Sequence, residues 1–215
     1  MISIEKALIE NIKQHWDAVY ENSKVERLGW FEQVPEPSLQ LINQCNLNED
    51  ASILNVGAGA TTLIDELIKL GFRNIIANDI SSVALNKLKV RIGNTTQSVS
   101  YVVDDLSKPE KLLKLYAIDL WHDRAVLHFL IKEEDQQTYF DLLKTLVKSK
   151  GFVIIATFNL NGAIKCSGLP VKQYDESLLQ DRLGSEFELK NSFDYTYHMP
   201  SGDTRQYVYT LFKRR

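Results

Sequence analysis

The sequence has few of the features that mark secreted, zinc-binding or membrane proteins. Only two cysteines are present, Cys45 and Cys166, and neither has a second cysteine nearby at the spacing of a zinc knuckle or a disulfide framework. No apolar stretch is long enough to cross a bilayer, and the amino terminus carries charges in every turn. We therefore expect a cytoplasmic protein with reduced thiols.

Neither sign of charge dominates the chain. The 28 acidic and 25 basic side chains leave a net charge of −3, so nothing attracts the protein non-specifically to phosphate backbones or anionic membranes. Nucleic acids and membranes are therefore not expected partners. No repeat or low-complexity linker divides the sequence. We expect a single domain, 1–215, in which a helical segment, 1–50, precedes an α/β core, 51–215.

Short apolar segments alternate with amphipathic segments from Ala51 onward. Gly151 is expected to cap the end of the longest of these helices. Because strand and helix alternate, the pattern predicts a doubly wound, Rossmann-like α/β fold with a mostly parallel sheet. The expected strands are 52–56, 74–78, 98–103, 117–121 and 151–158, and the expected helices are 61–70, 81–92, 109–115, 133–148 and 175–183.

The carboxyl-terminal part of the chain has a different pattern. Aromatic and apolar residues recur at spacings of two in 187–197 and again in 207–211. A turn sequence, Pro200-Ser201-Gly202, lies between the two segments. This arrangement predicts an antiparallel hairpin at the edge of the sheet.

Glycines or carboxylates follow each of the first three expected strands. Gly57-Ala58-Gly59 follows the first, Asp79 the second and Asp104-Asp105 the third. Alone, the glycine turn is equally well explained as a tight strand-to-helix connection, and an aspartate as a turn former. Together, at the sheet edge where α/β proteins bind ligands, they favour a nucleoside whose ribose hydroxyls bind Asp79 and whose adenine binds an acid after the third strand.

The glycine spacing argues against a dinucleotide. A G-x-G-x-x-G motif would place its third glycine at Thr62, where a β-branched side chain opposes close packing of the helix on the strand. The surplus of acids near the strand ends suits a ribose and a cationic sulfonium better than two phosphates. An NAD(P)-dependent oxidoreductase remains the alternative enzyme class.

Three segments resemble the successive cofactor motifs of the class I S-adenosylmethionine-dependent methyltransferases: 53–59 (ILNVGAG), 78–81 (NDIS) and 103–106 (VDDL). The resemblance covers nearly the whole chain. It implies a seven-stranded sheet that ends in an antiparallel hairpin, S-adenosylmethionine as the cofactor and S-adenosylhomocysteine as the product. The implied contacts are Gly57 and Gly59 under the methionine moiety, Asp79 at the ribose, Asp105 with the Leu106 backbone at the adenine, and Ala58 and Ile80 beside them.

Asn55 departs from this family, which usually has an acid in the first strand. The change weakens or reroutes contacts to the glycine loop and to the amino group of the cofactor, so Asn55 stays among the expected cofactor contacts. A non-catalytic S-adenosylmethionine-binding module is a further alternative, with Asn55 as its only support.

The segments 15–20, 30–31 and 35–39 resemble a subgroup that includes the lysine methyltransferase of citrate synthase and uncharacterised bacterial relatives. The aromatic residues in these segments either pack an amphipathic helix onto the sheet or close as a lid over the sulfonium. Trp30 is also an expected cofactor contact. The residues in question are Trp16, Tyr20, Trp30 and Phe31.

A dense group of ionisable side chains, 119–128 (DLWHDRAVLH), follows the fourth strand, where the family meets its acceptor. His122, Asp123 and His128 are the candidate catalytic residues, although a single histidine at such a place more often has a structural role. His122 is also a candidate cofactor contact. Arg124 is expected to pair with Asp123 or Asp119.

The loop 159–171, which contains Cys166-Ser167-Gly168-Leu169-Pro170, is expected to border the acceptor. Tyr195, Tyr197, His198 and Arg205 of the hairpin are further candidates, although packing explains the tyrosines equally well. No Asn-Pro-Pro-aromatic tetrapeptide follows the fourth strand, which argues against methylation of a flipped base. The acceptor is therefore expected to be a small molecule or a protein side chain, with nitrogen, oxygen and sulfur all open.

Overall fold

A computed structural model of the chain describes residues 2–93 and 98–215, so Met1, the first residue of the expected helical segment, lies outside the described part. The helices are α1 (Ile2–Asn22), α2 (Glu36–Gln44), α3 (Leu63–Lys69), α4 (Ser82–Ile92), α5 (Glu133–Leu146) and α6 (Glu176–Leu183), with short 3-10 turns η1 (Val25–Arg27), η2 (Leu112–Lys114) and η3 (Leu127–Phe129). The strands are β1 (Ser52–Val56), β2 (Asn74–Asp79), β3 (Val99–Val103), β4 (Ile118–Arg124), β5 (Val147–Phe158), β6 (Lys165–Cys166), β7 (Leu169–Pro170), β8 (Phe187–His198) and β9 (Thr204–Arg214).

The main sheet has seven strands in the order β3-β2-β1-β4-β5-β9-β8. The first five are parallel to one another, whereas β9 is antiparallel to both β5 and β8. The expected doubly wound, mostly parallel sheet with a terminal antiparallel hairpin is thus confirmed. The loop after β5, for which no strands were expected, forms the small hairpin β6–β7.

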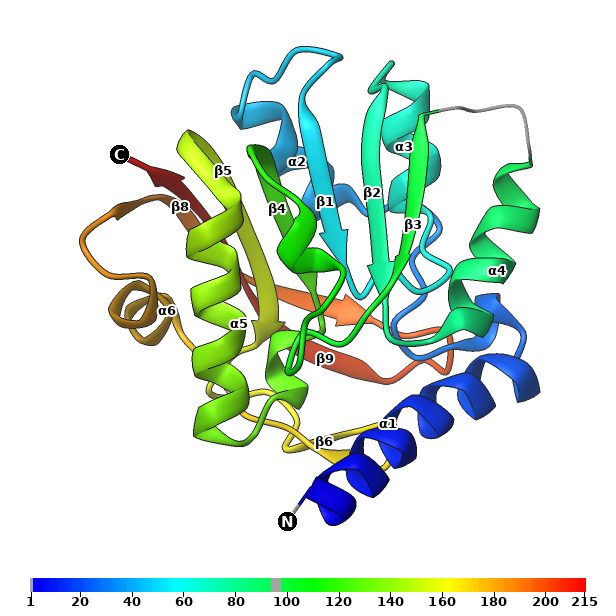
Figure 1. Cartoon of the computed structure of the whole chain (residues 1–215). Helices are drawn as coiled ribbons and strands as arrows, with labels where there is room; N and C mark the ends of the chain where they lie inside the picture. The colour runs from blue at the N-terminus through cyan, green and yellow to red at the C-terminus, as the bar shows by residue number, and fades with distance from the viewer. Residues whose placement is uncertain (1, 94–97) are drawn as a thin grey trace.

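Helices cover both faces of the sheet (Figure 1). Buried side chains of α2, α3 and α4 form one core, and those of α5 and α6 form the other. Consecutive residues of the central strands alternate between the two cores, as Ile53 and Leu54 of β1 illustrate. Because both faces are covered, β1 is buried along its whole length, including its polar residues Ser52 and Asn55.

The expected cap at Gly151 is wrong. Helix α5 ends at Leu146, and β5 begins at the next residue and contains Gly151. A Cβ atom at Gly151 would lie 2.9 Å from the carbonyl oxygen of Lys148 and 3.1 Å from that of Ile118. The glycine is therefore explained by a close approach of two backbones, near the shift in register between β4 and β5.

The helix expected at 109–115 is reduced to the single turn η2. The carboxylate of Asp104 accepts hydrogen bonds from the backbone N–H groups of Glu110, Lys111 and Leu112. The N–H groups that would begin a helix over 109–115 therefore donate to the side chain of Asp104, and the chain turns around this carboxylate.

Strand β4 is longer at its carboxyl end than the expected strand, 117–121. It continues to Arg124, and His122 and Asp123 pair in register with Asn55 and Val56 of β1 on one side and with Ile154 and Ile155 of β5 on the other. Both residues thus belong to the centre of the sheet rather than to a loop beyond it.

Helix α1 lies across the carboxyl ends of the parallel strands (Figure 1). Asp17 of α1 accepts a hydrogen bond from the hydroxyl of Ser81 at 2.6 Å and one from the N–H of Val83 at 3.3 Å. The Ser81 hydroxyl in turn accepts from the N–H of Ala84 at 3.1 Å and caps α4, which begins where the helix 81–92 was expected. The contact fixes α1 above the strand ends. No helix of the described residues is long and apolar enough to span a membrane.

Candidate functional site

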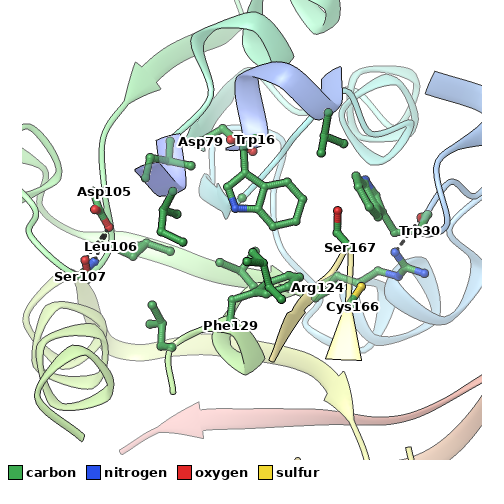
Figure 2. A pocket seen from close by; sticks show the side chains of 18 of the residues that line it. Trp16, Trp30, Asp79, Asp105, Leu106, Ser107, Arg124, Phe129, Cys166 and Ser167 are labelled. Atoms are coloured by element: carbon green, nitrogen blue, oxygen red, sulfur yellow. Dashed lines mark hydrogen bonds between the residues drawn. The ribbon is translucent and has the colours of Figure 1, made fainter. Parts of the chain in front are cut away.

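A cavity of about 750 Å³ lies beneath α1 at the ends of the parallel strands, a volume typical of small-molecule sites. Figure 2 shows its two ends, with Trp16 and Phe129 between them. We call the part lined by Asp79, Asp104 and Asp105 the acidic end. We call the part lined by Arg124, Cys166, Ser167 and Arg205 the arginine end.

The glycine loop between β1 and α3 borders the cavity. Gly57 and Gly59 have positive φ angles of 57° and 54°, which other residues rarely adopt. A Cβ atom would lie 2.0 Å from a methyl carbon of Val126 at Gly57, and 2.2 Å from the phenol oxygen of Tyr20 at Gly59. Both glycines are therefore required by conformation and by space, and Gly57 belongs to the cavity wall.

Asp79 ties the glycine loop to the end of β2. Its two carboxylate oxygens accept hydrogen bonds from the N–H of Gly59 at 2.7 Å and the N–H of Ser81 at 2.8 Å. Each oxygen can accept a second bond, so the carboxylate can still bind two hydroxyl groups. Burial raises the pKa of Asp79 to about 6, and the side chain, 7% exposed, lines the cavity next to Ile80.

The two aspartates after β3 differ in their availability. Asp104 holds the turn before η2 through one oxygen, as described above. Asp105 accepts from the N–H and hydroxyl of Ser107, both at 2.8 Å and both on the same oxygen. The other oxygen of Asp105 and the nearby backbone of Leu106 suit the amino-bearing edge of an adenine, and their contact with the cofactor stays a prediction.

Asn55 and His122 form a buried chain of hydrogen bonds below the cavity. Nδ1 of His122 lies 2.9 Å from Oδ1 of Asn55, and Nε2 lies 2.9 Å from the hydroxyl of Ser38. Burial lowers the pKa of His122 to about 3, so the ring is neutral. The three residues border a second cavity of about 50 Å³, which Trp30, Gly57 and Ala58 also line.

Asp123 is sealed from the large cavity. Its carboxylate accepts from the N–H groups of Val126 and Leu127, at 3.0 and 3.1 Å, and from the hydroxyl of Tyr139 at 2.7 Å. The side chain is 0% exposed, and burial raises its pKa to about 7. Asp123 thus shapes the turn after β4.

His128 is also fully buried. Its ring stacks on Phe158 with centroids 4.4 Å apart, and burial lowers its pKa to about 3. None of His122, Asp123 and His128 is among the described residues that line the large cavity. Their placement therefore does not support the expected catalytic roles, because a base has to reach the proton that it removes.

Arg124 does not pair with Asp123 or Asp119, contrary to expectation. Its Nε lies 3.0 Å from the carboxylate of Glu32, and the pair is almost buried, with side-chain exposures of 11% and 9%. Burial by itself lowers the pKa of Arg124, but the surrounding tyrosines and Glu32 more than offset this effect and the guanidinium stays charged. Asp119 instead pairs with Lys148 and accepts from the N–H of Ser52.

The amino-terminal aromatic residues gather above the cavity. Trp16 packs edge-on against Trp30 and Phe129, with ring centroids 5.6 and 5.0 Å apart. The indole N–H of Trp30 donates to the hydroxyl of Tyr20 at 3.3 Å. Trp16, Tyr20 and Trp30 line the large cavity, whereas Phe31 lines only the small one.

The hairpin β6–β7 brings its turn to the arginine end, where Cys166 and Ser167 line the cavity (Figure 2). The Ser167 hydroxyl is 3.4 Å from Nε2 of His15 in α1. Of the four hairpin candidates expected at the acceptor, Arg205 lines the cavity, while Tyr195, Tyr197 and His198 are not among its described lining residues.

The sequence analysis did not single out Glu32, Phe129 or Tyr139. Phe129 adjoins the ionisable stretch 119–128, and a slightly longer window would have included it. Glu32 and Tyr139 contact β4 from segments distant in sequence, so no spacing pattern could have indicated them.

The residues at the acidic end suit S-adenosylmethionine. Gly57 lines the cavity where no larger side chain fits, and Asp79 has a second acceptor position on each carboxylate oxygen. Apolar and aromatic side chains around these groups exclude water from a reacting methyl group. Fold and cavity together define a Rossmann-like protein with a nucleoside-cofactor site.

Known proteins agree with this conclusion. The chain is 26% identical over 159 residues to EEF1A lysine methyltransferase 2 of Danio rerio and 28% identical over 167 residues to that of Mus musculus. These matches cover 68% of this chain in both cases, and 68% and 65% of the relatives. No family model matches the chain.

Solved structures share the fold. A SAM-dependent methyltransferase from Anabaena variabilis superposes with a TM-score of 0.77 at 16% identity, covering 97% of this chain and 95% of that one. The N-methyltransferase NodS of Bradyrhizobium japonicum, in complex with S-adenosylhomocysteine, superposes with a TM-score of 0.68 at 13% identity, covering 93% and 98%.

The protein is an S-adenosylmethionine-dependent methyltransferase, and its relatives and its fold support the resemblance to the class I family. Its cofactor is S-adenosylmethionine and its product is S-adenosylhomocysteine, as the sequence predicts. The oxidoreductase and the non-catalytic binding module are disfavoured. The resemblance to the citrate synthase subgroup stays a prediction, because the relatives above carry another name.

Proposed function

We propose that the protein transfers a methyl group to the side-chain nitrogen of a lysine in another protein. The relatives that align over two thirds of the chain are named lysine methyltransferases. The structural observation that carries the proposal is the continuity of one cavity from the acidic end to the aromatic side chains of Trp16, Trp30 and Phe129. Aromatic faces bind alkyl chains and methylated ammonium groups.

We assign the adenosyl group to the acidic end. Asp79 would bind the ribose, Asp105 and Leu106 the adenine, and Gly57 the methionine moiety. Gly59 would act by holding the carboxylate of Asp79. Asn55 and His122 would support the glycine loop from the small cavity below it, through the hydrogen bond that joins them.

When bound, S-adenosylmethionine supplies a methyl group on a cationic sulfur; the acceptor nitrogen uses its lone pair to form the new bond to carbon, and the carbon–sulfur electron pair returns to sulfur. An amine has to lose a proton to water before this attack. Desolvation by Trp16, Trp30 and Phe129 favours the neutral form of the amine. The role of these side chains is then to align and desolvate the acceptor, without a histidine base.

The opening of the cavity suits a protein partner. Ile12 and Ile131 line it and are 37% and 50% exposed. Apolar side chains at these positions can pack against the methylene groups of a lysine that enters the cavity. A lysine side chain could enter here while its own backbone stays outside.

The proposal is tested by incubating the purified protein with tritiated S-adenosylmethionine and a cell lysate. We expect acid-insoluble label that is recovered as methyl-lysine after hydrolysis of the protein fraction. The control variant Asp79→Asn should give no label in the acid-insoluble protein fraction and none among the small molecules. Label found only among small molecules would refute the lysine acceptor while leaving methyl transfer itself intact.

A further inference from the structure

The two ends of the cavity carry opposite charges. The acids that line it, Asp79, Asp104, Asp105, Glu134 and Asp135, follow β2 or β3 or belong to α5. Among the described lining residues, none from β4, β9 or the β6–β7 hairpin is acidic, and β4 and β9 contribute Arg124 and Arg205. Arg27, Lys108 and Lys132 line the cavity as well, and Glu32 balances Arg124, so the net positive charge of the arginine end comes from Arg205.

Several contacts fix the guanidinium group of Arg124. Its Nη1 donates to the carbonyl of Trp30 and its Nε to the hydroxyl of Tyr209, both at 3.0 Å, and Glu32 balances its charge. Its Nη2 is buried and has no hydrogen-bond partner among the described residues. Because this atom has no exposed surface, it does not face the cavity, and Glu32 and the rings of Tyr197 and Tyr207, whose centroids lie 5.0 and 5.3 Å away, enclose the guanidinium.

Arg205 has even fewer partners. It is half-buried, and its Nη1 donates to the adjacent carbonyl of Thr204 at 2.9 Å. No carboxylate of the described residues forms an ion pair with it, unlike Arg214 at the other end of β9, which pairs with Glu186. Arg205 therefore presents an uncompensated charge to the cavity.

Arg205 shares the cavity wall with Cys166 and Ser167 of the β6–β7 hairpin. A partly desolvated cation without a counterion is costly, and an anion that binds there recovers the cost through charge-assisted hydrogen bonds.

We propose that the acceptor carries a carboxylate or another anionic group close to the atom that is methylated, and that Arg205, which lines the cavity without an ion-pair partner among the described residues, binds this group. The inference deepens the proposed function, on whose assignment of the two ends it rests. In a protein acceptor the anion is an aspartate or glutamate near the target lysine. In a small-molecule acceptor it is the carboxylate of the molecule itself.

Binding of a matched pair of probes tests the charge preference. 3-Phenylpropionate and 3-phenylpropionamide have the same shape and differ in charge, and the fluorescence of Trp16 and Trp30 reports binding in the presence of S-adenosylhomocysteine. We expect the carboxylate to bind about tenfold more tightly than the amide, the value of one charge-assisted hydrogen bond. Arg205→Gln should abolish the difference and Arg205→Lys should keep part of it.

The control variant is Lys190→Gln, which removes a positive charge from β8 of the same hairpin at a residue paired with Glu188. It should keep the full preference for the carboxylate. Equal binding of the two probes to the unmodified protein, or the same loss in Lys190→Gln as in Arg205→Gln, would overturn the proposal.

The labelled product from the lysate separates the two sources of the anion. A methylated lysine with an acidic residue within two positions identifies a protein acceptor, and a labelled small molecule retained by an anion exchanger at neutral pH identifies a free acid. The second result would refute the lysine acceptor but not the role of Arg205. A product with no anionic group near the methylated atom would refute the role of Arg205 but not methyl transfer.

Discussion

Asp79 and Asp123 are both buried aspartates at the ends of parallel strands, on opposite sides of β1, yet the fold uses them differently. Burial raises the pKa of Asp79 to about 6 and that of Asp123 to about 7. Asp79 borders the cavity and keeps free acceptor positions, whereas Asp123 is closed in by Tyr139 and the turn after β4. Access to the cavity, rather than an unusual pKa, distinguishes a binding residue from a structural one.

The largest effect expected from this comparison is on cofactor binding. Replacing Asp79 by asparagine removes a charged acceptor of two hydroxyl hydrogen bonds, so affinity for S-adenosylhomocysteine should fall about a hundredfold or more. Isothermal titration calorimetry measures the change, and the circular dichroism spectrum should match that of the unmodified protein. Affinity retained within threefold would place the ribose elsewhere.

Asp123→Asn should show the opposite behaviour. The free energy of unfolding should fall by about 2 kcal/mol, because a buried acceptor of three hydrogen bonds is weakened. Cofactor affinity should stay within threefold. The matched control is Asp141→Asn on the surface of α5, where the aspartate accepts one exposed bond from Gln137 and the expected loss is below about 0.5 kcal/mol.

The pH dependence of the free energy of unfolding provides a second test of Asp123→Asn. The folded-state pKa of Asp123, about 7, lies above its ordinary value of 3.8, because the folded protein binds the proton of this carboxyl more tightly than the unfolded chain does. The contribution of Asp123 to the free energy of unfolding is therefore complete below pH 3.8 and is lost as the pH rises to about 7. Denaturant unfolding should therefore show stability falling between pH 6 and pH 7. Asp123→Asn should flatten this fall, and an unchanged slope would contradict the placement of Asp123.

Cofactor affinity should depend on pH through Asp79. Ribose hydroxyls donate to the ionised carboxylate, so affinity for S-adenosylhomocysteine should rise up to about tenfold per pH unit below pH 6 and level off above it. Calorimetry at pH 5, 6 and 7 measures this rise. It should persist in Asp123→Asn and disappear in Asp79→Asn, and the reverse pattern would exchange the roles of the two residues.

The smallest effect concerns Asn55. An aspartate there would place a charge 2.9 Å from the neutral ring of His122, and the pKa of His122 should rise because an opposite charge favours its protonated form. Titration of His122 by nuclear magnetic resonance detects the change in Asn55→Asp. Cofactor affinity should change less than threefold, and a tenfold gain would mean that residue 55 contacts the cofactor directly.

The sequence predicts the acidic end well because local constraints define it. Gly57 and Gly59 need positive φ angles and Ser81 caps the next helix, and such requirements leave direct traces in the residues themselves. The alternation of strand and helix likewise predicts the seven-stranded sheet.

The candidate bases were misplaced because the end of β4 carries no local signal. Nothing in Trp121-His122-Asp123-Arg124 stops a strand, and the strand continues because β1 pairs with it as far as Asp123 and β5 as far as Arg124. Three further residues in the strand put His122 and Asp123 inside the sheet. The partners of Arg124 are equally invisible in sequence, since Glu32 approaches it from a segment ninety-two positions earlier.

The most direct test of the account is a crystal structure of the protein with S-adenosylhomocysteine. We predict that the ribose hydroxyls lie within hydrogen-bond distance of both Asp79 oxygens, that the adenine lies beside Asp105 and Leu106, and that the sulfur faces Trp30 and Arg124. An adenosyl group found at the arginine end, or bound outside the cavity beneath α1, would contradict the assignment of the two ends.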